Sequence, residues 1–188
     1  MARARGELDP PGAEKAVEDL LRALGYDLAE ESLRDTPRRV AAAYVEMLAP
    51  RPFDPTTFPN DEGYDALVVA RRIPFSSLCE HHLLPFVGVA HVGYSPGGRI
   101  LGLSKLARVV ELYSRELQVQ ERMTMQVAHW LEDRLQPRGV GVILEAEHMC
   151  MSIRGVRAPG ARTTTSALLG SVRSDARTRQ EFLDLVRG

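Results

Sequence analysis

The sequence predicts an α+β protein in which a helical N-terminal segment precedes a domain of strand pairs around two central helices. Three observations support this class. Apolar residues recur at helical spacing near the N-terminus, strand patterns with turn residues follow, and two consecutive helical patterns separate those strands from a second strand pair. At 188 residues the chain can bury one core, and no fixed-period repeat is present.

The N-terminal segment is expected to contain two helices. Residues 1–10 are polar and end at a Pro-Pro step, which predicts a mobile arm. Residues 12–24 carry apolar side chains at helical spacing and form the first helix. Thr36 is the expected N-cap of the second helix, Pro37 its first helical residue, and Pro50 ends it.

Residues 52–63 are rich in Pro, Asp, Asn and Thr, which predicts a connecting loop. This loop gives the most natural boundary in the chain. We therefore expect a flexible arm over 1–10, a helical segment and linker over 11–63, and a domain that carries the chemistry over 64–188.

The first strand pair is predicted over residues 66–73 and 87–94. The turn residues 95–98, Ser-Pro-Gly-Gly, then join the second strand to 100–101, which is typical of a β-hairpin. Strands therefore dominate this stretch.

The central helices are predicted over residues 106–117 and 123–135, because their apolar residues repeat every three or four positions. Residues 140–147 and 163–172 are rich in β-branched side chains and predict a second strand pair. A closing helix is expected over 175–186.

Composition excludes several classes of function. Lys plus Arg number 24 against 25 Asp plus Glu, so no net field favours a nucleic-acid backbone or an anionic membrane. The N-terminus lacks an apolar stretch, and no run is long enough to span a bilayer. These features predict a cytoplasmic protein without nucleic-acid or membrane partners.

Cysteine and histidine residues form two tight groups. Cys79 and His82 lie three residues apart, a spacing that lets a thiolate and an imidazole bind one zinc ion. Cys150, the other cysteine, follows His148 by two residues at the end of a predicted strand, where both side chains point to the same face. A lone cysteine is more often a small buried hydrophobe, but the clustering favours Zn²⁺ bound by Cys79, His82 and Cys150.

Three protein ligands leave the fourth zinc position for water, which distinguishes a catalytic site from a closed structural one. His81 and His148 then remain for proton transfer near neutral pH. The alternative is that they support the ligands through hydrogen bonds.

A local anion site is predicted where the first central helix begins. Ser104 can cap this helix, while Lys105 and Arg108 lie three residues apart near its positive end. Only two lysines occur in the chain, Lys15 and Lys105. Arg154 can join the same anion pocket, although an ordinary solvated helix start remains the alternative.

The second central helix opens with Gln120 and Glu121. An amide beside a carboxylate can donate and accept hydrogen bonds along the edge of guanine. An acid at this position also simply suits a helix N-terminus.

Four motifs together resemble the GTP cyclohydrolase I family, in the family's order. They are Cys79-Glu80-His81-His82, Gly102-Leu103-Ser104-Lys105, Gln118-Val119-Gln120-Glu121-Arg122 and His148-Met149-Cys150. Thr36-Pro37-Arg38-Arg39 and the Thr-rich segment 163–170 resemble further family segments. The similarity runs from about Leu33 to Val186.

The resemblance implies a zinc hydrolase acting on GTP. Water activated at zinc would attack C8 of guanine, open the imidazole ring and release formate, giving 7,8-dihydroneopterin triphosphate, the first step of folate and pterin biosynthesis. His81 and His148 would move protons, Glu121 with Gln120 would bind guanine, and Ser104 would serve the ribose rearrangement.

The resemblance also implies how triphosphate is bound and how the chains assemble. Lys105, Arg108 and Arg154 would bind the triphosphate, and Arg39 would reach that of a neighbouring subunit. The family adopts a tunnelling fold, an antiparallel sheet with two central helices, here preceded by N-terminal helices. Its subunits share a β-barrel, commonly as a homodecamer with sites between subunits.

Three other functions are compatible with part of this pattern. A zinc deaminase also uses one His and two Cys, but its H-x-E and P-C-x-x-C elements are absent. A zinc-stabilised module without catalysis would close the fourth position, for example with His148. Another tunnelling-fold purine or pterin enzyme would alter the metal ligands or guanine contacts.

Overall fold

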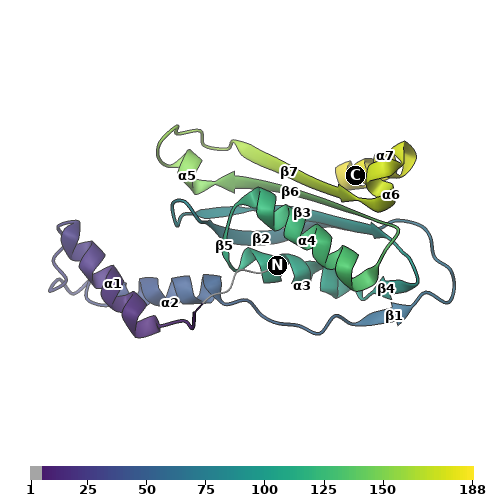
Figure 1. Cartoon of the computed structure of the whole chain (residues 1–188). Coiled ribbons are helices and arrows are strands. Elements are labelled where there is room, and N and C mark those ends of the chain that lie inside the picture. The colour runs from purple at the N-terminus through teal and green to yellow at the C-terminus, as the bar shows by residue number, and fades with distance from the viewer. Residues whose placement is uncertain (1–5) are drawn as a thin grey trace. The chain divides into compact units, whose positions relative to one another are not determined.

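The computed structural model describes residues 6–188 as two compact units, one extending to Ala49 and the other covering Pro50–Gly188 (Figure 1). Part of the predicted N-terminal arm, residues 1–5, lies outside the described residues. The three-part division predicted from the sequence, with boundaries after residues 10 and 63, stays a prediction.

The smaller unit is a pair of helices, α1 (Pro10–Ala23) and α2 (Thr36–Leu48). Helix α1 begins two residues earlier than predicted, because Asp9 caps its first turn and proline occupies the first helical positions. Helix α2 begins one residue earlier than predicted, at Thr36. Its N-cap is Asp35 rather than Thr36, and the Asp35 side chain makes no capping bond.

The larger unit is built on a curled five-stranded sheet with the order β5-β2-β3-β6-β7. All neighbouring strands are antiparallel except β2 and β5. The strands are β2 (Val68–Cys79), β3 (Pro85–Ser95), β5 (Leu117–Gln118), β6 (Gly139–His148) and β7 (Arg162–Leu169). The predicted α+β class is confirmed.

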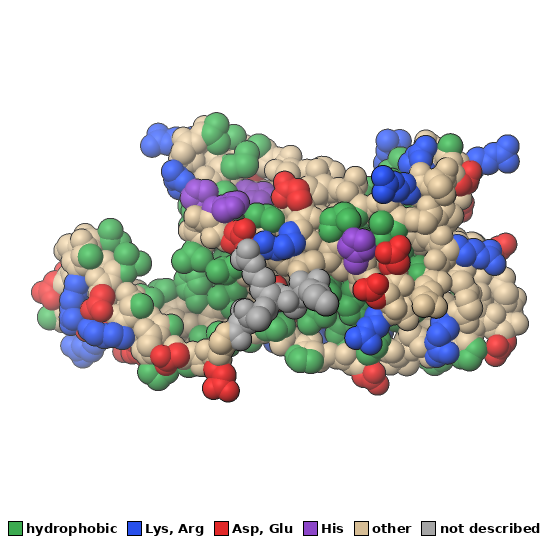
Figure 2. All heavy atoms as spheres, viewed as in Figure 1, with side chains coloured by type: hydrophobic (Ala, Val, Ile, Leu, Met, Phe, Trp, Pro, Cys, Tyr) green, Lys and Arg blue, Asp and Glu red, His purple; other side chains and the backbone are tan. Residues whose placement is uncertain are grey.

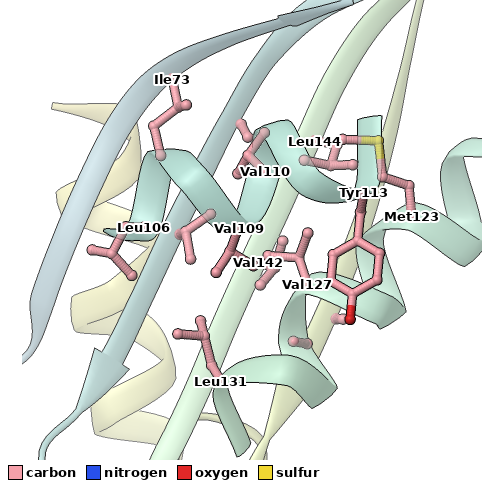
Figure 3. Close-up of a cluster of buried hydrophobic side chains, with 14 of the residues drawn as sticks. Ile73, Leu106, Val109, Val110, Tyr113, Met123, Val127, Leu131, Val142 and Leu144 are labelled. Atoms are coloured by element: carbon pink, nitrogen blue, oxygen red, sulfur yellow. The ribbon is translucent and has the colours of Figure 1, made fainter. Parts of the chain in front are cut away.

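Two helices, α3 (Leu103–Ser114) and α4 (Gln120–Leu135), pack on one face of this sheet (Figure 1). Alternate residues of β3 point toward them, and the buried ones are Phe86, Ala90, Val92 and Tyr94. Their partners on the helices recur every three or four residues, which is why the sequence predicted both helices (Figure 3). These partners include Leu106, Val109, Val110, Met123, Val127 and Leu131.

The opposite face of the sheet is covered at one end by α6 (Gly170–Ser174) and α7 (Ala176–Arg187). Phe182 of α7 is fully buried there. Its ring lies against Gly93 of β3 and Gly141 of β6, where any side chain would collide with it. Glycine at both positions therefore leaves the space that the Phe182 ring occupies.

The predicted hairpin through residues 95–98 is wrong. Strand β4 (Arg99–Leu101) leaves the main sheet and pairs with β1 (Thr57–Pro59), which lies within the predicted loop 52–63. The side chain of Asn60 donates to the carbonyl of Gly97 at 2.9 Å and so ties the β1 segment to this turn. The actual hairpin joins β2 to β3 through residues 80–84.

Helix positions agree with the sequence more closely than strand ends do. The central helices and the closing helix are confirmed, although the first central helix spans 103–114 rather than 106–117. The strand predicted over 66–73 continues to Cys79. The strand predicted over 163–172 ends at Leu169, and Gly170, with a φ of 54°, opens α6. None of the helices formed by residues 6–188 combines the length and the hydropathy needed to cross a bilayer.

Gly141→Ala should destabilise the protein, because the new Cβ would lie 2.7 Å from ring atoms of the buried Phe182. Over-packing of this kind costs about 1–3 kcal/mol. Thermal unfolding followed by circular dichroism measures the effect. The control is Gly98→Ala, whose Cβ meets no atom within 4 Å. Equal Tm values for the two variants would contradict the conclusion that Phe182 requires glycine at position 141.

Candidate metal centre and its surroundings

The candidate site lies at the tip of the β2–β3 hairpin. Cys79 is the last residue of β2 and is buried, and the chain reverses over residues 80–84. Bonds from the Cys79 N–H to the Leu84 carbonyl and from the Leu83 N–H to the Cys79 carbonyl, both 2.9 Å, close this turn. Histidine side chains gather on the surface at this end of the larger unit (Figure 2).

Cys150 reaches the same place from β6. Phe86, near the start of β3, pairs with His148, the last residue of β6. Cys150 was predicted at the end of a strand. It lies instead in the short helix α5 (Met149–Ser152) that follows β6. His148 therefore reaches the hairpin tip from the end of strand β6, whereas Cys150 reaches it from helix α5.

One ligand atom from each of Cys79, His82 and Cys150 lies within 4.8 Å of the other two. The Cys79 Sγ and His82 Nδ1 atoms are 3.7 Å apart. Within residues 6–188 no other group of three potential ligands meets this criterion. The structure therefore brings together the three predicted ligands, which could hold a metal ion.

Burial, reinforced by the neighbouring Cys79 thiol, raises the pKa of the Cys150 thiol. A metal ion binds the thiolate, so metal binding must release the proton that burial favours. Arg154 acts in the opposite direction and lowers this pKa. The Arg154 charge therefore acts on the cluster.

His148 lies beside the metal ligands in a defined orientation. Its ring stacks on that of Phe86, with centroids 4.6 Å apart and planes within 3°. Its Nε2 is 2.8 Å from Oε1 of Gln120. Burial lowers the pKa of His148, and the Glu121 charge opposes this only in part. The imidazole is therefore held in its neutral form near pH 7.

Gln120, the first residue of α4, determines which nitrogen of His148 carries the proton. It is buried, and its amide nitrogen donates to the carbonyls of Leu144 and Thr163 at 3.1 and 2.9 Å, with Thr165 Oγ1 also within reach. Its Oε1 must therefore accept a bond from the Nε2–H of His148. The lone pair of His148 then resides on Nδ1.

His81 lies on the exposed side of the cluster. Its Nδ1 is 3.9 Å from the Cys79 Sγ, and its Nε2 is 3.8 Å from the Glu80 carboxylate. Glu121 lies in the first turn of α4, next to Gln120. The predicted proton-transfer and guanine-binding groups are thus at the same end of the sheet as the metal ligands.

The predicted phosphate-binding residues of α3 lie at the other end of the sheet. The N-cap of α3 is Gly102, not Ser104 as predicted, so Ser104 and Lys105 lie in the first helical turn. This turn follows β4, which contacts the end of β3 through a bond from the Leu101 N–H to Tyr94 Oη. Tyr94 pairs with Val68, the first residue of β2, whereas Cys79 is its last.

The predicted anion ligands lie on three segments, with Lys105 and Arg108 both on α3. Lys105 Nζ is 5.8 Å from the centroid of the Phe53 ring, and Arg108 forms an ion pair with Glu111 at 2.9 Å. Arg154 follows α5 near the metal cluster. Arg39 belongs to α2 of the smaller unit, where it donates to the Ser32 carbonyl.

Two residues near the site received no role from the sequence. Phe86 supplies the surface on which His148 stacks, and Arg122 forms an ion pair with Glu80 at 2.7 Å. The alternation of β3 indicates that Phe86 faces inward, but only the β3–β6 register places it opposite His148. Arg122 belongs to the motif Gln118–Arg122, but no apolar or polar periodicity around it indicates a partner.

Comparison with known proteins agrees with the motifs. The sequence model of the GTP cyclohydrolase I family matches residues 13–187. GTP cyclohydrolase 1 of Mycobacterium ulcerans is 56% identical over 183 residues, covering 95% of this chain and 91% of that protein. GTP cyclohydrolase 1 of Streptomyces avermitilis is 55% identical over 186 residues, covering 96% and 92%.

A third relative is similar over a comparable length. GTP cyclohydrolase 1 of Streptococcus suis is 52% identical over 177 residues, which cover 92% of this chain and 95% of that protein. Such identity over nearly the whole length of both proteins leaves no large part of the chain unmatched. Together with the match to the family model, it shows that this chain belongs to the GTP cyclohydrolase I family.

Proposed function

We propose that this protein is a zinc-dependent GTP cyclohydrolase that hydrolyses GTP at C8 of guanine, releases formate and forms 7,8-dihydroneopterin triphosphate. The product would enter folate or pterin biosynthesis in the cytoplasm. The convergence of Cys79, His82 and Cys150 within 4.8 Å is the observation that carries this proposal. Family membership supports GTP as the substrate.

The three ligands fit zinc by their chemistry. Two thiols and one imidazole form the mixed sulfur and nitrogen set that suits Zn²⁺ better than harder cations such as Mg²⁺. Zinc bound by three protein groups would keep an open position and supply a Lewis acid that activates water near neutral pH.

His148 is suited to accept a proton at Nδ1. The bond from its Nε2–H to Gln120 leaves the Nδ1 lone pair available, and burial favours the neutral ring. The Gln120 amide is occupied by this bond and by its bonds to β6 and β7, so its side chain would contribute by holding His148. His81, on the exposed side, would exchange protons with solvent.

Glu121 would orient the guanine. A carboxylate accepts hydrogen bonds and matches the N–H groups on the edge of that base. Its place in the first turn of α4, one residue after Gln120, would hold the base beside His148 and the metal ligands. Fixing the base in this way would bring C8 near the metal ligands.

The triphosphate site is best explained by contacts between subunits. Ser104 and Lys105 lie at the opposite end of the sheet from Cys79, and the twelve-residue strand β2 between these ends spans roughly 35 Å at about 3.3 Å per residue. GTP cannot bridge that span within one chain. We therefore propose that Ser104, Lys105 and Arg108 serve the metal centre of a neighbouring subunit, while Arg154 serves its own and Arg39 reaches across as well.

The sheet offers the means of assembly. Among residues 6–188, β5 covers only the last two residues of β2, and β7 has a strand on one side only. Two long open edges invite pairing with further copies of the chain. We propose that they close a shared barrel in a tunnelling-fold homodecamer.

Replacing Cys150 by Ala should abolish zinc binding and GTP turnover, since two remaining ligands cannot hold the ion. Metal analysis of purified protein should give one zinc per wild-type chain and almost none in the variant. His129→Ala, on the exposed face of α4 and paired with Glu132, is the control and should keep both. Full zinc content in the Cys150 variant would remove Cys150 from the ligand set.

Glu121→Gln should weaken GTP turnover without loss of zinc. A charged hydrogen bond is worth about 1.5–3 kcal/mol, so kcat/KM should fall roughly 10- to 150-fold. Formate release and the fluorescence of the oxidised pterin measure turnover. The same change at the exposed Glu132 of α4 is the matched control, and unaltered kinetics of the Glu121 variant would exclude its role at guanine.

Sites built between subunits should be restored by mixing. Oligomers of Lys105→Ala alone or of Cys150→Ala alone should be inactive. In mixed oligomers, about a quarter of the sites should combine Cys150 from one subunit with Lys105 from its neighbour, because the two variants assemble at random. Activity should return in that proportion. Co-expression with two different tags isolates such mixed oligomers. If they form and remain inactive, Lys105 and Cys150 serve the same subunit's site.

A further inference from the structure

The side chain of Glu80 lies between the metal-binding hairpin and helix α4. Glu80 directly follows the ligand Cys79 and precedes the ligand His82 by two residues. Its Oε2 accepts a bond of 2.7 Å from Nη2 of Arg122, and both side chains are largely buried, with 18% and 26% of their surfaces exposed. A carboxylate inside the ligand loop is thus bound to an arginine outside it.

Arg122 is itself held by the segment before α4. The same Nη2 donates to the Leu117 carbonyl at 2.8 Å, and Nε donates to Oε1 of Gln118 at 3.0 Å. Gln118 is fully buried and donates its amide hydrogens to the Tyr113 carbonyl and to Gln126, at 2.9 and 2.8 Å. Its Oε1 must therefore face Arg122, and these bonds hold the guanidinium with Nη2 directed at Glu80.

The main chain alone fastens the ligand loop to this segment only weakly. Strand β5 pairs with β2 at two residues, Leu117 with Leu78 and Gln118 with Cys79. One further bond, of 3.0 Å, joins the Glu80 N–H to the Gln118 carbonyl. Across the same junction, Ser77 Oγ donates to the Glu116 carbonyl at 3.2 Å, and the ion pair between Glu80 and Arg122 is the side-chain connection that reaches the ligand loop itself.

We propose that Arg122 is a positioning residue, which acts through Glu80 to fix Cys79 and His82 relative to the first turn of α4. That turn carries Gln120, which holds His148, and Glu121. Largely buried ion pairs are poor evidence for stability, because desolvation offsets their attraction; fixed geometry explains this one better. The other oxygen of Glu80 lies 3.8 Å from His81 Nε2, so the same carboxylate is also close to His81. The catalytic consequence rests on the proposed function, whereas the effect on metal binding does not.

The test measures zinc affinity by competition with a chromophoric chelator, without GTP, and then kcat and KM on zinc-saturated protein. Arg122→Met keeps the length of the side chain and removes its charge and its hydrogen bonds. Zinc affinity should fall about 10- to 100-fold, as for other residues that orient metal ligands. kcat should fall more than KM rises, and Arg122→Lys, which keeps one bond to Glu80, should lie between Met and wild type.

Glu80→Gln and the double variant show whether Arg122 acts through Glu80. If it does, the double variant should bind zinc no more weakly than the weaker single variant, whereas independent effects would multiply. Glu80→Gln preserves size and a hydrogen-bonding oxygen, so it also provides the test if Arg122→Met fails to fold. Unchanged zinc affinity in a folded Glu80→Gln variant would overturn the proposal.

Arg115→Met is the matched control. Arg115 is similarly buried, with 21% of its side chain exposed. Its Nε lies 3.3 Å from Oε1 of Glu111, a residue of α3 rather than of the ligand loop. The zinc affinity of the Arg115→Met variant should match that of the wild type. An equal loss of zinc affinity in both arginine variants would show that Arg122 only stabilises the protein in general. A wild-type protein that binds zinc tightly but releases no formate from GTP would refute the proposed function and leave this result standing.

Discussion

The ten-residue antiparallel pairing of β3 with β6 determines whether the metal ligands meet. Cys79 and His82 enter the site from the hairpin before β3, and Cys150 enters from the helix after β6, so the register of these two strands sets the distance between them. A slip of one residue would turn His148 to the other face and move Cys150 along by about 3.3 Å. At Gly88 a side chain would collide with the main chain of β6, so close approach of the strands requires glycine there.

Around this sheet, buried polar side chains make the site end of the molecule rigid. Gln118 and Gln120 are both buried, and their amide groups are bound to main-chain carbonyls on α3, β6 and β7. Such networks define geometry when every member is satisfied. Gln120 thus ties the start of α4 to β6 and β7 by hydrogen bonds, and Arg122 ties it to Glu80 of the hairpin.

The sequence predicted the parts of this arrangement that depend on local pattern. Apolar spacing was sufficient for the central helices, and ligand chemistry was sufficient to group Cys79, His82 and Cys150. Register and partner choice were not predictable in this way: Pro96 and the glycines after it mark a turn, but only tertiary contacts send β4 to β1 instead of β3. For the same reason the stacking of His148 on Phe86 emerged only from the structure.

Phe182 gives the last helix an importance that its exposed surface conceals. Its ring fills the space left by Gly93 and Gly141, two positions on neighbouring strands that offer no side chain of their own. Proteolysis or a frameshift upstream of residue 182 would therefore bare a strip of unprotected sheet rather than merely shorten the chain. A bared strip of that kind favours aggregation and recognition by cellular quality control, so damage far from the metal ligands could lower the amount of enzyme without touching its chemistry.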